Sequence, residues 1–202
     1  LRSKLILLLL GSMVPLLVMS LANAWISYRS ERERLERSTE AVARGVALGV
    51  ALEVQRGLAG LNALSLSRPL CAGNLVDFRR QVDRFMEVQH PGANLVLSDA
   101  SGQQLINLLA PAGEPLPARR NRELVRESIA RGGGLVSNVY AGTYQDRIVT
   151  LEVPVYCRGE ARYNLALVPR LDVFQAGLLQ QRPPDDWSLF LLDAKGEAIA
   201  ST

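Results

Sequence analysis

The stretch NLVLSDASGQQLINL, residues 94–108, predicts two β-strands joined by a tight turn. Apolar residues alternate before the D-A-x-G turn and resume after it, which is typical of a β-hairpin. The last fifteen residues, SLFLLDAKGEAIAST, repeat this pattern 94 positions later. We therefore expect one module and the first hairpin of a second one. The five identical pairs are Leu95/Leu189, Leu97/Leu191, Asp99/Asp193, Ala100/Ala194 and Gly102/Gly196.

The composition indicates a folded chain. With 202 residues, of which 48% are apolar, the chain has enough material for one or two domains with a real core. Its 23 basic and 20 acidic residues are intermixed, so the net charge of +3 does not indicate a nucleic-acid partner. The chain begins with Leu1 rather than Met and stops just after a strand pattern. We expect it to be the N-terminal part of a longer protein.

The N-terminal segment is strongly apolar. Between Lys4 and Arg29 no residue is charged, and about 20 apolar residues in a helix cross the roughly 30 Å hydrocarbon core of a bilayer. We therefore predict a cytoplasmic tip and a transmembrane helix over residues 1–28. The basic residues before the apolar run place the N-terminus in the cytoplasm, and Trp25 and Tyr28 suit the opposite interface. Everything after about residue 28 is then expected in the periplasm, outside a bacterial inner membrane.

A cleaved signal peptide is the alternative, because Ala22-Asn23-Ala24 forms an A-x-A cleavage site after an apolar run. Either interpretation exports the rest of the chain. Cys71 and Cys157 then lie in an oxidising compartment, which permits a disulfide between them. Two buried free thiols are the alternative, because sequence does not show whether the two Cα atoms lie within about 7 Å.

Residues 29–68 predict a long extracytoplasmic helix, since apolar residues recur at helical spacing and Pro69 ends the pattern. Its apolar stripe is expected to contact its own domain and a second copy of the chain, as in a parallel dimer. Residues 69–172 predict an α+β module with helices at 75–89 and 121–134 against a five-stranded antiparallel sheet. Strands are expected within 94–108 and at 135–140, 147–159 and 160–171, followed by a linking helix and proline-rich break at 173–186 and a truncated second module at 187–202.

No catalytic site, metal site or cofactor is expected in this chain. The only histidine, His90, lies in a turn and has no cluster of cysteines or carboxylates beside it in the sequence. The glycines of RGGGL, residues 131–135, follow a helix and precede a strand, which is the reverse of a phosphate-binding loop. Asp185 and Asp186 are adjacent and are expected to cap or break a helix.

A binding surface is predicted around NVYAGTYQDRIV, residues 138–149, which combines aromatic and charged groups. Tyrosine supplies a stacking face with a hydroxyl group, and Arg147 can fork onto a carboxylate. The alternative is a plain hairpin loop with a surface pair of Asp146 and Arg147. The candidate ligand-binding residues are Asn107, Tyr140, Tyr144, Asp146, Arg147 and Tyr156.

With these elements in this order, the chain resembles the double Cache sensor domain, a PAS-like domain of bacterial membrane receptors. The strings NLVLSDASGQQLINL, GEPLP, VTLEVPVYCRGEARYNLALV and LLQQRPPDDWSLFLLDAKGEAIA are similar to the periplasmic segment of sensor histidine kinases. The resemblance implies a pocket for a small-molecule ligand in the membrane-distal module and a parallel homodimer through the long helix. It also implies a downstream kinase that uses ATP and Mg, and a response regulator, both acting through domains that this chain does not contain.

The resemblance leaves the ligand and the output open. Cache domains that bind amino acids carry an Arg and a Trp at set positions, and we do not find that pair here, because Trp25 lies in the apolar segment and Trp187 in the second module. The expected function is ligand sensing for a two-component histidine kinase. The alternatives are the same sensor on a diguanylate cyclase or a chemoreceptor, and a secreted small-molecule-binding module.

Overall fold

The computed structural model describes residues 2–111, 113–181, 183–184 and 186–202, without the side chains of residues 2–12 and 14–16. The chain forms two compact units, residues 1–45 and 46–202. Asp185, which we expected to cap or break a helix, lies outside the described residues.

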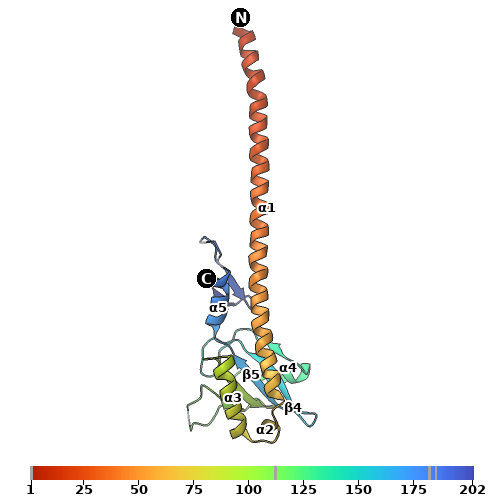
Figure 1. The fold of residues 1–202 in the computed structure, drawn as a ribbon, viewed down its shortest axis with the longest axis vertical. Helices are drawn as coiled ribbons and strands as arrows, with labels where there is room; N and C mark the ends of the chain where they lie inside the picture. The colour runs from red at the N-terminus through yellow and green to blue at the C-terminus, as the bar shows by residue number, and fades with distance from the viewer. Residues whose placement is uncertain (1, 112, 182, 185) are drawn as a thin grey trace. The chain divides into compact units, whose positions relative to one another are not determined.

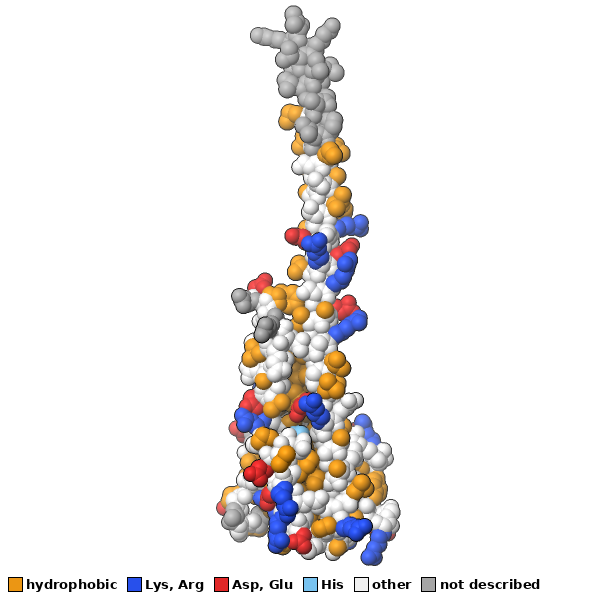
Figure 2. Space-filling model, in the orientation of Figure 1, with side chains coloured by type: hydrophobic (Ala, Val, Ile, Leu, Met, Phe, Trp, Pro, Cys, Tyr) orange, Lys and Arg blue, Asp and Glu red, His pale blue; other side chains and the backbone are white. Residues whose placement is uncertain are grey.

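The first unit is the N-terminal part of helix α1, Arg2–Ser65. Its polar stretch carries pairs of opposite charge four residues apart, such as Arg37 with Glu33 at 2.9 Å, and Figure 2 shows these mixed clusters along the helix. Exposed pairs of this kind stabilise a helix by only a few tenths of a kcal/mol. In the part of the chain that the structure describes, no helix is both long and apolar enough to cross a membrane. The predicted span overlaps residues 5–12 and 14–16, whose side chains are not described.

The second unit begins with the last turns of α1 and two further helices (Figure 1). The α1 helix ends at Ser65, three residues before the predicted end, and a short helix α2, Arg68–Cys71, starts there with a proline in its first turn. Proline is accepted in that position because the first N–H groups of a helix have no partner within the helix. Helix α3, Leu75–Gln89, matches its predicted range, and Asn74 caps it by accepting a hydrogen bond from the Asp77 N–H at 3.1 Å.

The sheet has five strands in the order β2-β1-β5-β4-β3, and every neighbouring pair is antiparallel. The predicted α+β class and strand number are therefore confirmed. The central strand β5 is buried on both faces along its second half, which explains its nearly continuous apolar sequence. The strands are β1 Asn94–Asp99, β2 Gln104–Asn107, β3 Leu135–Val136, β4 Leu151–Cys157 and β5 Glu160–Val168.

Three predicted strands are shorter in the structure, since β5 ends at Val168 and not at residue 171. The strand expected at 135–140 has only two residues in β3, and the strand expected at 147–159 starts at Leu151. Between them the chain leaves the sheet and makes a turn in which the Gly142 N–H donates to the Gln145 carbonyl at 2.8 Å. The two sides of this excursion are joined by a hydrogen bond from the Ser137 N–H to the Thr150 carbonyl at 2.9 Å and by a bridge of Tyr140 with Ile148. Helix α4, Arg122–Arg131, ends at Gly132 with φ +66°, a left-handed conformation that favours glycine.

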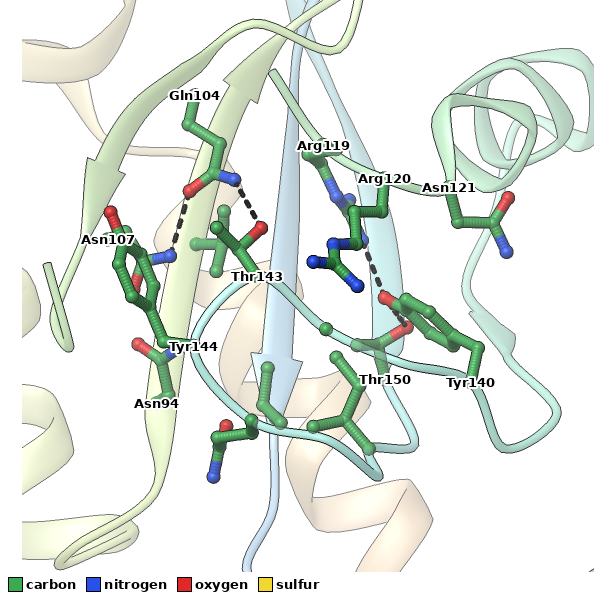
Figure 3. A pocket seen from close by; sticks show the side chains of 15 residues that line it. Asn94, Gln104, Asn107, Arg119, Arg120, Asn121, Tyr140, Thr143, Tyr144 and Thr150 are labelled. Atoms are coloured by element: carbon green, nitrogen blue, oxygen red, sulfur yellow. Dashed lines mark hydrogen bonds between the residues drawn. The ribbon is translucent and has the colours of Figure 1, made fainter. Parts of the chain in front are cut away.

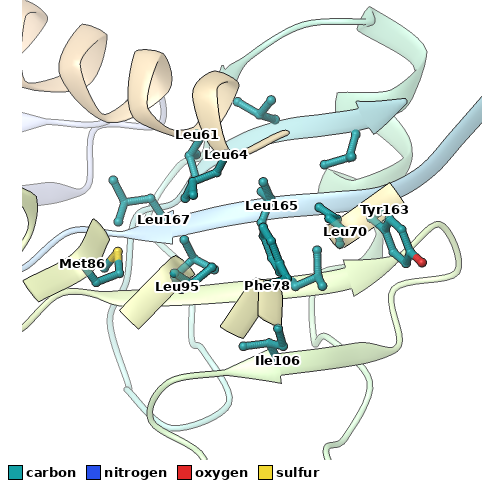
Figure 4. Packing of buried hydrophobic residues seen from close by; sticks show 14 of the residues in the cluster. Leu61, Leu64, Leu70, Phe78, Met86, Leu95, Ile106, Tyr163, Leu165 and Leu167 are labelled. Carbon is teal, nitrogen blue, oxygen red and sulfur yellow. The ribbon is translucent and has the colours of Figure 1, made fainter. Parts of the chain in front are cut away.

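The main core lies between one face of the sheet and the helices α1, α2 and α3. Figure 4 shows Leu61 and Leu64 of α1 and Phe78 of α3 pointing toward β1 and β5. Leu165 at the centre of β5 is opposite Leu97 on one side and Val153 on the other, and all three side chains are buried. The opposite face of the sheet carries a much smaller apolar cluster, Val96, Ile148, Ala166 and Val168, and is covered mainly by loops.

A disulfide joins the helical layer to the sheet. Cys71 at the end of α2 bonds to Cys157 at the end of β4, with Cα atoms 5.4 Å apart and a sequence separation of 86. Of the two states left open by the sequence, bonded or free, the structure has the bonded one. Closing a loop of this length removes conformational freedom from the unfolded chain, which stabilises a protein by about 2–4 kcal/mol.

The C-terminal repeat forms a hairpin that matches the first one locally. After helix α5, Leu171–Gln180, strands β6, Phe190–Leu192, and β7, Ala198–Ser201, pair antiparallel. In each hairpin the turn aspartate accepts hydrogen bonds from the backbone N–H groups two and four residues later, at 2.9 and 3.0 Å for Asp99 and at 2.8 Å twice for Asp193. That this hairpin opens a second module remains a prediction.

Candidate functional site

A small cavity lies between the loop-covered face of the sheet and the segment 141–147. Its volume is about 30 Å³, which is room for one or two water molecules. Figure 3 shows the segment crossing over the cavity, with polar side chains from β1, β2 and the loops around it. The residues lining it are Asn94, Val96, Gln104, Asn107, Arg119, Arg120, Asn121, Tyr140, Gly142, Thr143, Tyr144, Gln145, Ile148, Thr150 and Val168.

A buried ion pair forms the floor on the α4 side of the cavity. Arg119, just before α4, binds both carboxylate oxygens of Glu152 in β4, with Nη1 donating to Oε2 at 2.7 Å and Nη2 donating to Oε1. The side chains are 6% and 0% exposed. Thr150 Oγ1 donates to Glu152 Oε1 at 2.7 Å, and the Asn164 amide donates to Oε2. Glu152 is thus fully engaged within the protein, which is the condition under which a buried carboxylate is tolerated.

Tyr140 extends this network toward the cavity. Arg119 Nη2 donates to the Tyr140 hydroxyl oxygen at 3.2 Å, and that hydroxyl lies 3.5 Å from Thr150 Oγ1 (Figure 3). Burial raises the pKa of Tyr140, so its hydroxyl keeps its proton at neutral pH. Burial alone would lower the pKa of Arg119, but the Glu152 carboxylate outweighs it and raises that pKa. Arg119 is therefore always charged and is neutralised by Glu152.

The neighbouring cation, Arg120, differs from Arg119 in both exposure and partners. Its side chain is exposed at the cavity and makes no hydrogen bond or ion pair with any residue that the structure describes. Among the described residues that line the cavity none is a carboxylate. The cavity therefore has one cation that is free to bind an anion.

Neutral amides form the side of the cavity opposite the arginines. The Asn107 amide donates to Gln104 Oε1 at 2.8 Å, and the Gln104 amide donates to the Thr143 hydroxyl at 3.1 Å. The second bond fastens the segment 141–147 to β2 (Figure 3). Tyr144 follows in the same segment with its side chain 37% exposed. The arrangement offers hydrogen-bond donors and acceptors without charge on this side.

Three comparisons with solved structures place this architecture. The sensor domain of the V. cholerae histidine kinase DctB matches with a TM-score of 0.61 and 15% identity, over 84% of this chain and 67% of that chain. The ligand-binding domain of the Pseudomonas aeruginosa amino acid chemoreceptor PctC, in complex with GABA, gives 0.56 and 15%, over 80% and 71%. The sensory domain of the Campylobacter jejuni chemoreceptor Tlp3 with isoleucine bound gives 0.52 and 14%, over 81% and 71%. No protein-family model and no curated protein matches the chain.

The chain has the fold of a Cache sensor domain. The predicted α+β fold with a long helix and an antiparallel sheet is thereby confirmed, while the second module and the membrane helix remain predictions. At 14–15% identity the likeness concerns the fold, so the ligand must be argued from the residues of this chain itself.

The structure separates the six residues predicted to bind a ligand. Asn107, Tyr140 and Tyr144 line the cavity of the Cache domain, and the first two take part in its hydrogen bonds. Asp146 is exposed and is not among the lining residues. Arg147 is not among the lining residues either and donates to the Ala198 carbonyl of β7.

Tyr156 is not among the lining residues and lies near the end of α4. Its hydroxyl donates to the Ile129 carbonyl near the end of α4 at 3.2 Å. We placed it near the cavity because it belongs to a neighbouring strand. Alternate residues of a strand point to opposite faces, however, and a register shift between Val155 and Tyr156 interrupts that alternation.

The charged residues of the site, Glu152, Arg119 and Arg120, were not predicted from the sequence. Glu152 had a usable signal, since an acidic residue in the apolar strand LEVPV must have a buried partner. Arg119 and Arg120 lay in the loop PLPARRN, which we treated only as a proline-rich connection. Nothing in the sequence distinguishes the two arginines, because only the fold shows which one reaches Glu152.

His90 lies outside this site. It caps α3, is 5.6 Å from the Phe85 ring between centroids, and burial lowers its pKa while Glu53 opposes that shift. The described residues contain no group of three His, Cys, Asp or Glu side chains that is able to hold a metal ion.

Proposed function

We propose that this chain is the ligand-sensing extracytoplasmic part of a membrane receptor, and that the cavity beneath 141–147 binds a small carboxylate. The observation that carries the proposal is the pair of adjacent arginines, of which Arg119 is neutralised by Glu152 and Arg120 is not. A guanidinium group binds a carboxylate through two parallel hydrogen bonds. Arg120 would supply this contact, and the amides of Gln104 and Asn107 would bind neutral oxygens of the ligand.

The charge of the lining argues for a carboxylate without an ammonium group. An amino acid brings an ammonium charge as well as a carboxylate, and the described lining has no carboxylate to neutralise that positive charge beside Arg120. PctC and Tlp3 were solved with GABA and isoleucine. In this chain we propose a simpler acid, such as a short mono- or dicarboxylate.

The volume of the cavity gives the proposal a mechanism. A cavity of about 30 Å³ is too small to enclose a carboxylate of several carbon atoms, so in the proposed mechanism the segment 141–147 moves outward when one binds. A ligand changes the balance between two conformations only through its different affinity for them. The proposed ligand would favour the open position of the segment, and the protein would report the shift.

The output and topology belong to the same proposal. We infer that residues after about 28 lie in the periplasm, that α1 continues into a membrane anchor and pairs with a second copy in a parallel dimer, and that a histidine kinase follows. The long apolar stripe of α1 and the sequence resemblance to sensor kinases support this. ATP, Mg and a response regulator would act on domains outside this chain.

The test is a thermal-shift and calorimetric titration of the whole chain with acetate, propionate and succinate. Acetamide, propionamide and succinamide serve as uncharged controls, and alanine tests the effect of an ammonium group. We expect at least one acid to raise the melting temperature, as any ligand of the native state does, while its amide and alanine do not. Equal shifts with acids and amides would contradict the proposal.

Matched variants locate the site. Arg120→Ala is expected to weaken binding about tenfold or more, because it removes a charge-assisted hydrogen bond. Arg126→Ala removes an exposed arginine on α4 that does not line the cavity, and it should leave the affinity unchanged. Retained binding in Arg120→Ala, or equal loss in both variants, would contradict the assignment of the site to this cavity.

A further inference from the structure

The segment that covers the cavity is also tied to the C-terminal hairpin. Just before the segment 141–147, Asp193 Oδ2 accepts a hydrogen bond from the Val139 N–H at 2.9 Å, and the Ala194 N–H donates to Asn138 Oδ1 at 3.1 Å. At its end, Arg147 donates to the Ala198 carbonyl. The β6–β7 hairpin therefore holds both ends of the segment that would have to move when a ligand enters.

Asp193 has a role that its counterpart in the first hairpin lacks. Both Asp99 and Asp193 use Oδ1 to close their own turns. Asp193 also uses Oδ2 to reach Val139, whereas Asp99 makes no such bond through Oδ2 to any described residue. The additional bond is not needed to form the turn, because the Asp99 turn forms without it.

The point of attachment is next to the cavity. Val139 precedes Tyr140, which lines the cavity and exchanges two backbone hydrogen bonds with Ile148, at 3.0 and 2.9 Å. These two hydrogen bonds make the start of the segment rigid, so that a movement of the segment would also move Val139. From Val139 the next contact is the Asp193 carboxylate.

We propose that Asp193 is a positioning residue that couples the cavity segment 139–147 to the β6–β7 hairpin, so that ligand entry changes the hairpin. This inference rests on the proposed function for its ligand, although the contact itself exists without one. Backbone N–H groups of Val139, Glu197 and Lys195 outweigh the effect of desolvation and lower the pKa of Asp193, which is thus ionised at neutral pH.

The first experiment compares Asp193→Asn with Asp99→Asn in the ligand-free whole chain by amide hydrogen exchange. An asparagine side chain keeps one carbonyl oxygen to close the turn, but its amide group cannot accept the Val139 N–H. In Asp193→Asn we expect exchange in peptides covering 139–147 to become about tenfold faster, because a hydrogen bond to a charged group is lost. Asp99→Asn should leave those peptides unchanged. Unchanged exchange in β4 and β5 peptides of both variants verifies folding.

Unchanged exchange of 139–147 in Asp193→Asn, or an equal increase in both variants, would overturn the coupling. A second arm adds succinate at saturating concentration. In the unsubstituted chain and in Asp99→Asn, succinate should alter exchange in peptides covering 190–201, and in Asp193→Asn it should not. An equal response of 190–201 in all three proteins would also overturn the role of Asp193. If none of the acids binds, the proposed function fails, while the ligand-free comparison still decides whether the contact holds the segment.

Discussion

Arg119 and Glu152 form an ion pair with two hydrogen bonds in the interior of the domain, and this pair fixes the loop before α4 to β4. Because each side chain is at most 6% exposed, neither charge is hydrated in the folded state. The pair therefore has a structural role, and it leaves the next residue, Arg120, as the cation to which we assign the proposed carboxylate. Two adjacent arginines thus have different tasks because only one of them reaches a carboxylate.

Removing the carboxylate of this pair should be among the most destabilising single changes in the domain. Glu152→Gln leaves the Arg119 charge buried without a counter-charge, and we expect the free energy of unfolding to fall by about 3–5 kcal/mol. Urea denaturation followed by circular dichroism measures the change. Glu160→Gln, at the exposed start of β5, is the matched control and should change stability by less than about 0.5 kcal/mol. A loss below about 1 kcal/mol in Glu152→Gln would show that the pair is not buried as described.

Reducing the disulfide should lower the free energy of unfolding of the whole domain rather than unfold single helices or strands. With Cys71 and Cys157 reduced, we expect the free energy of unfolding to fall by about 2–4 kcal/mol, since the unfolded chain regains the freedom of an 86-residue loop. Urea curves with and without dithiothreitol provide the measurement. A Cys71→Ser/Cys157→Ser double variant should match the reduced protein and show no response to dithiothreitol; a response in that variant would attribute the effect to something other than the bond.

Three glycines should respond to alanine with different signs. Gly102 has φ +87°, and an added Cβ would lie 3.0 Å from Arg122 Cγ, so Gly102→Ala should lower the free energy of unfolding by about 1–3 kcal/mol. Gly196 has φ +83° with open space around it, so its replacement should lower stability less. Gly49 lies in α1 with nothing within 4 Å of an added Cβ, and Gly49→Ala should raise stability by up to about 1 kcal/mol. Denaturant titration of all three variants checks the order, which a destabilised Gly49→Ala would contradict.

The Tyr140 hydroxyl should lose its proton at a higher pH than a free tyrosine, and its ionisation should lower the stability of the fold at alkaline pH. Burial raises its pKa above the ordinary value of 10.0, so the folded state favours the neutral phenol. This contribution to stability is fully present below pH 10 and is lost as the pH rises through the higher pKa of the folded state. The phenolate absorbance at 295 nm, taken as the difference between the chain and Tyr140→Phe, should have its midpoint above 10 in the folded protein and near 10 in urea. A folded midpoint at or below 10 would contradict the burial of this hydroxyl.

Much of the fold was predictable because its signals are local. The alternation in NLVLSD, the periodicity over 75–89 and the turn aspartates at Asp99 and Asp193 each depend on a few neighbouring residues. The strand expected at 135–140 is longer than the observed strand β3. Its residues have strand-like composition, but after β3 the chain leaves the sheet and leads into the segment 141–147 that covers the cavity. Tertiary packing overrode propensity at that point.

The site was predictable only in part because its decisive contacts connect distant residues. Tyr140 and Tyr144 were identified from their chemistry in one loop. Arg119 and Glu152 are 33 positions apart and become partners only when the loop before α4 folds back over β4. Arg147 had the right chemistry for a carboxylate, but the hairpin 51 positions later engages it instead.

The bond between Cys71 and Cys157 has one more consequence, for a domain exposed to proteases. The backbone between these residues includes the exposed stretch 113–115, and a cut there would leave both fragments covalently attached. Such a nick would be invisible in a gel without reductant and would give two bands with it. The sheet strands on either side of the cut would stay covalently linked, so the clipped domain would remain in one piece.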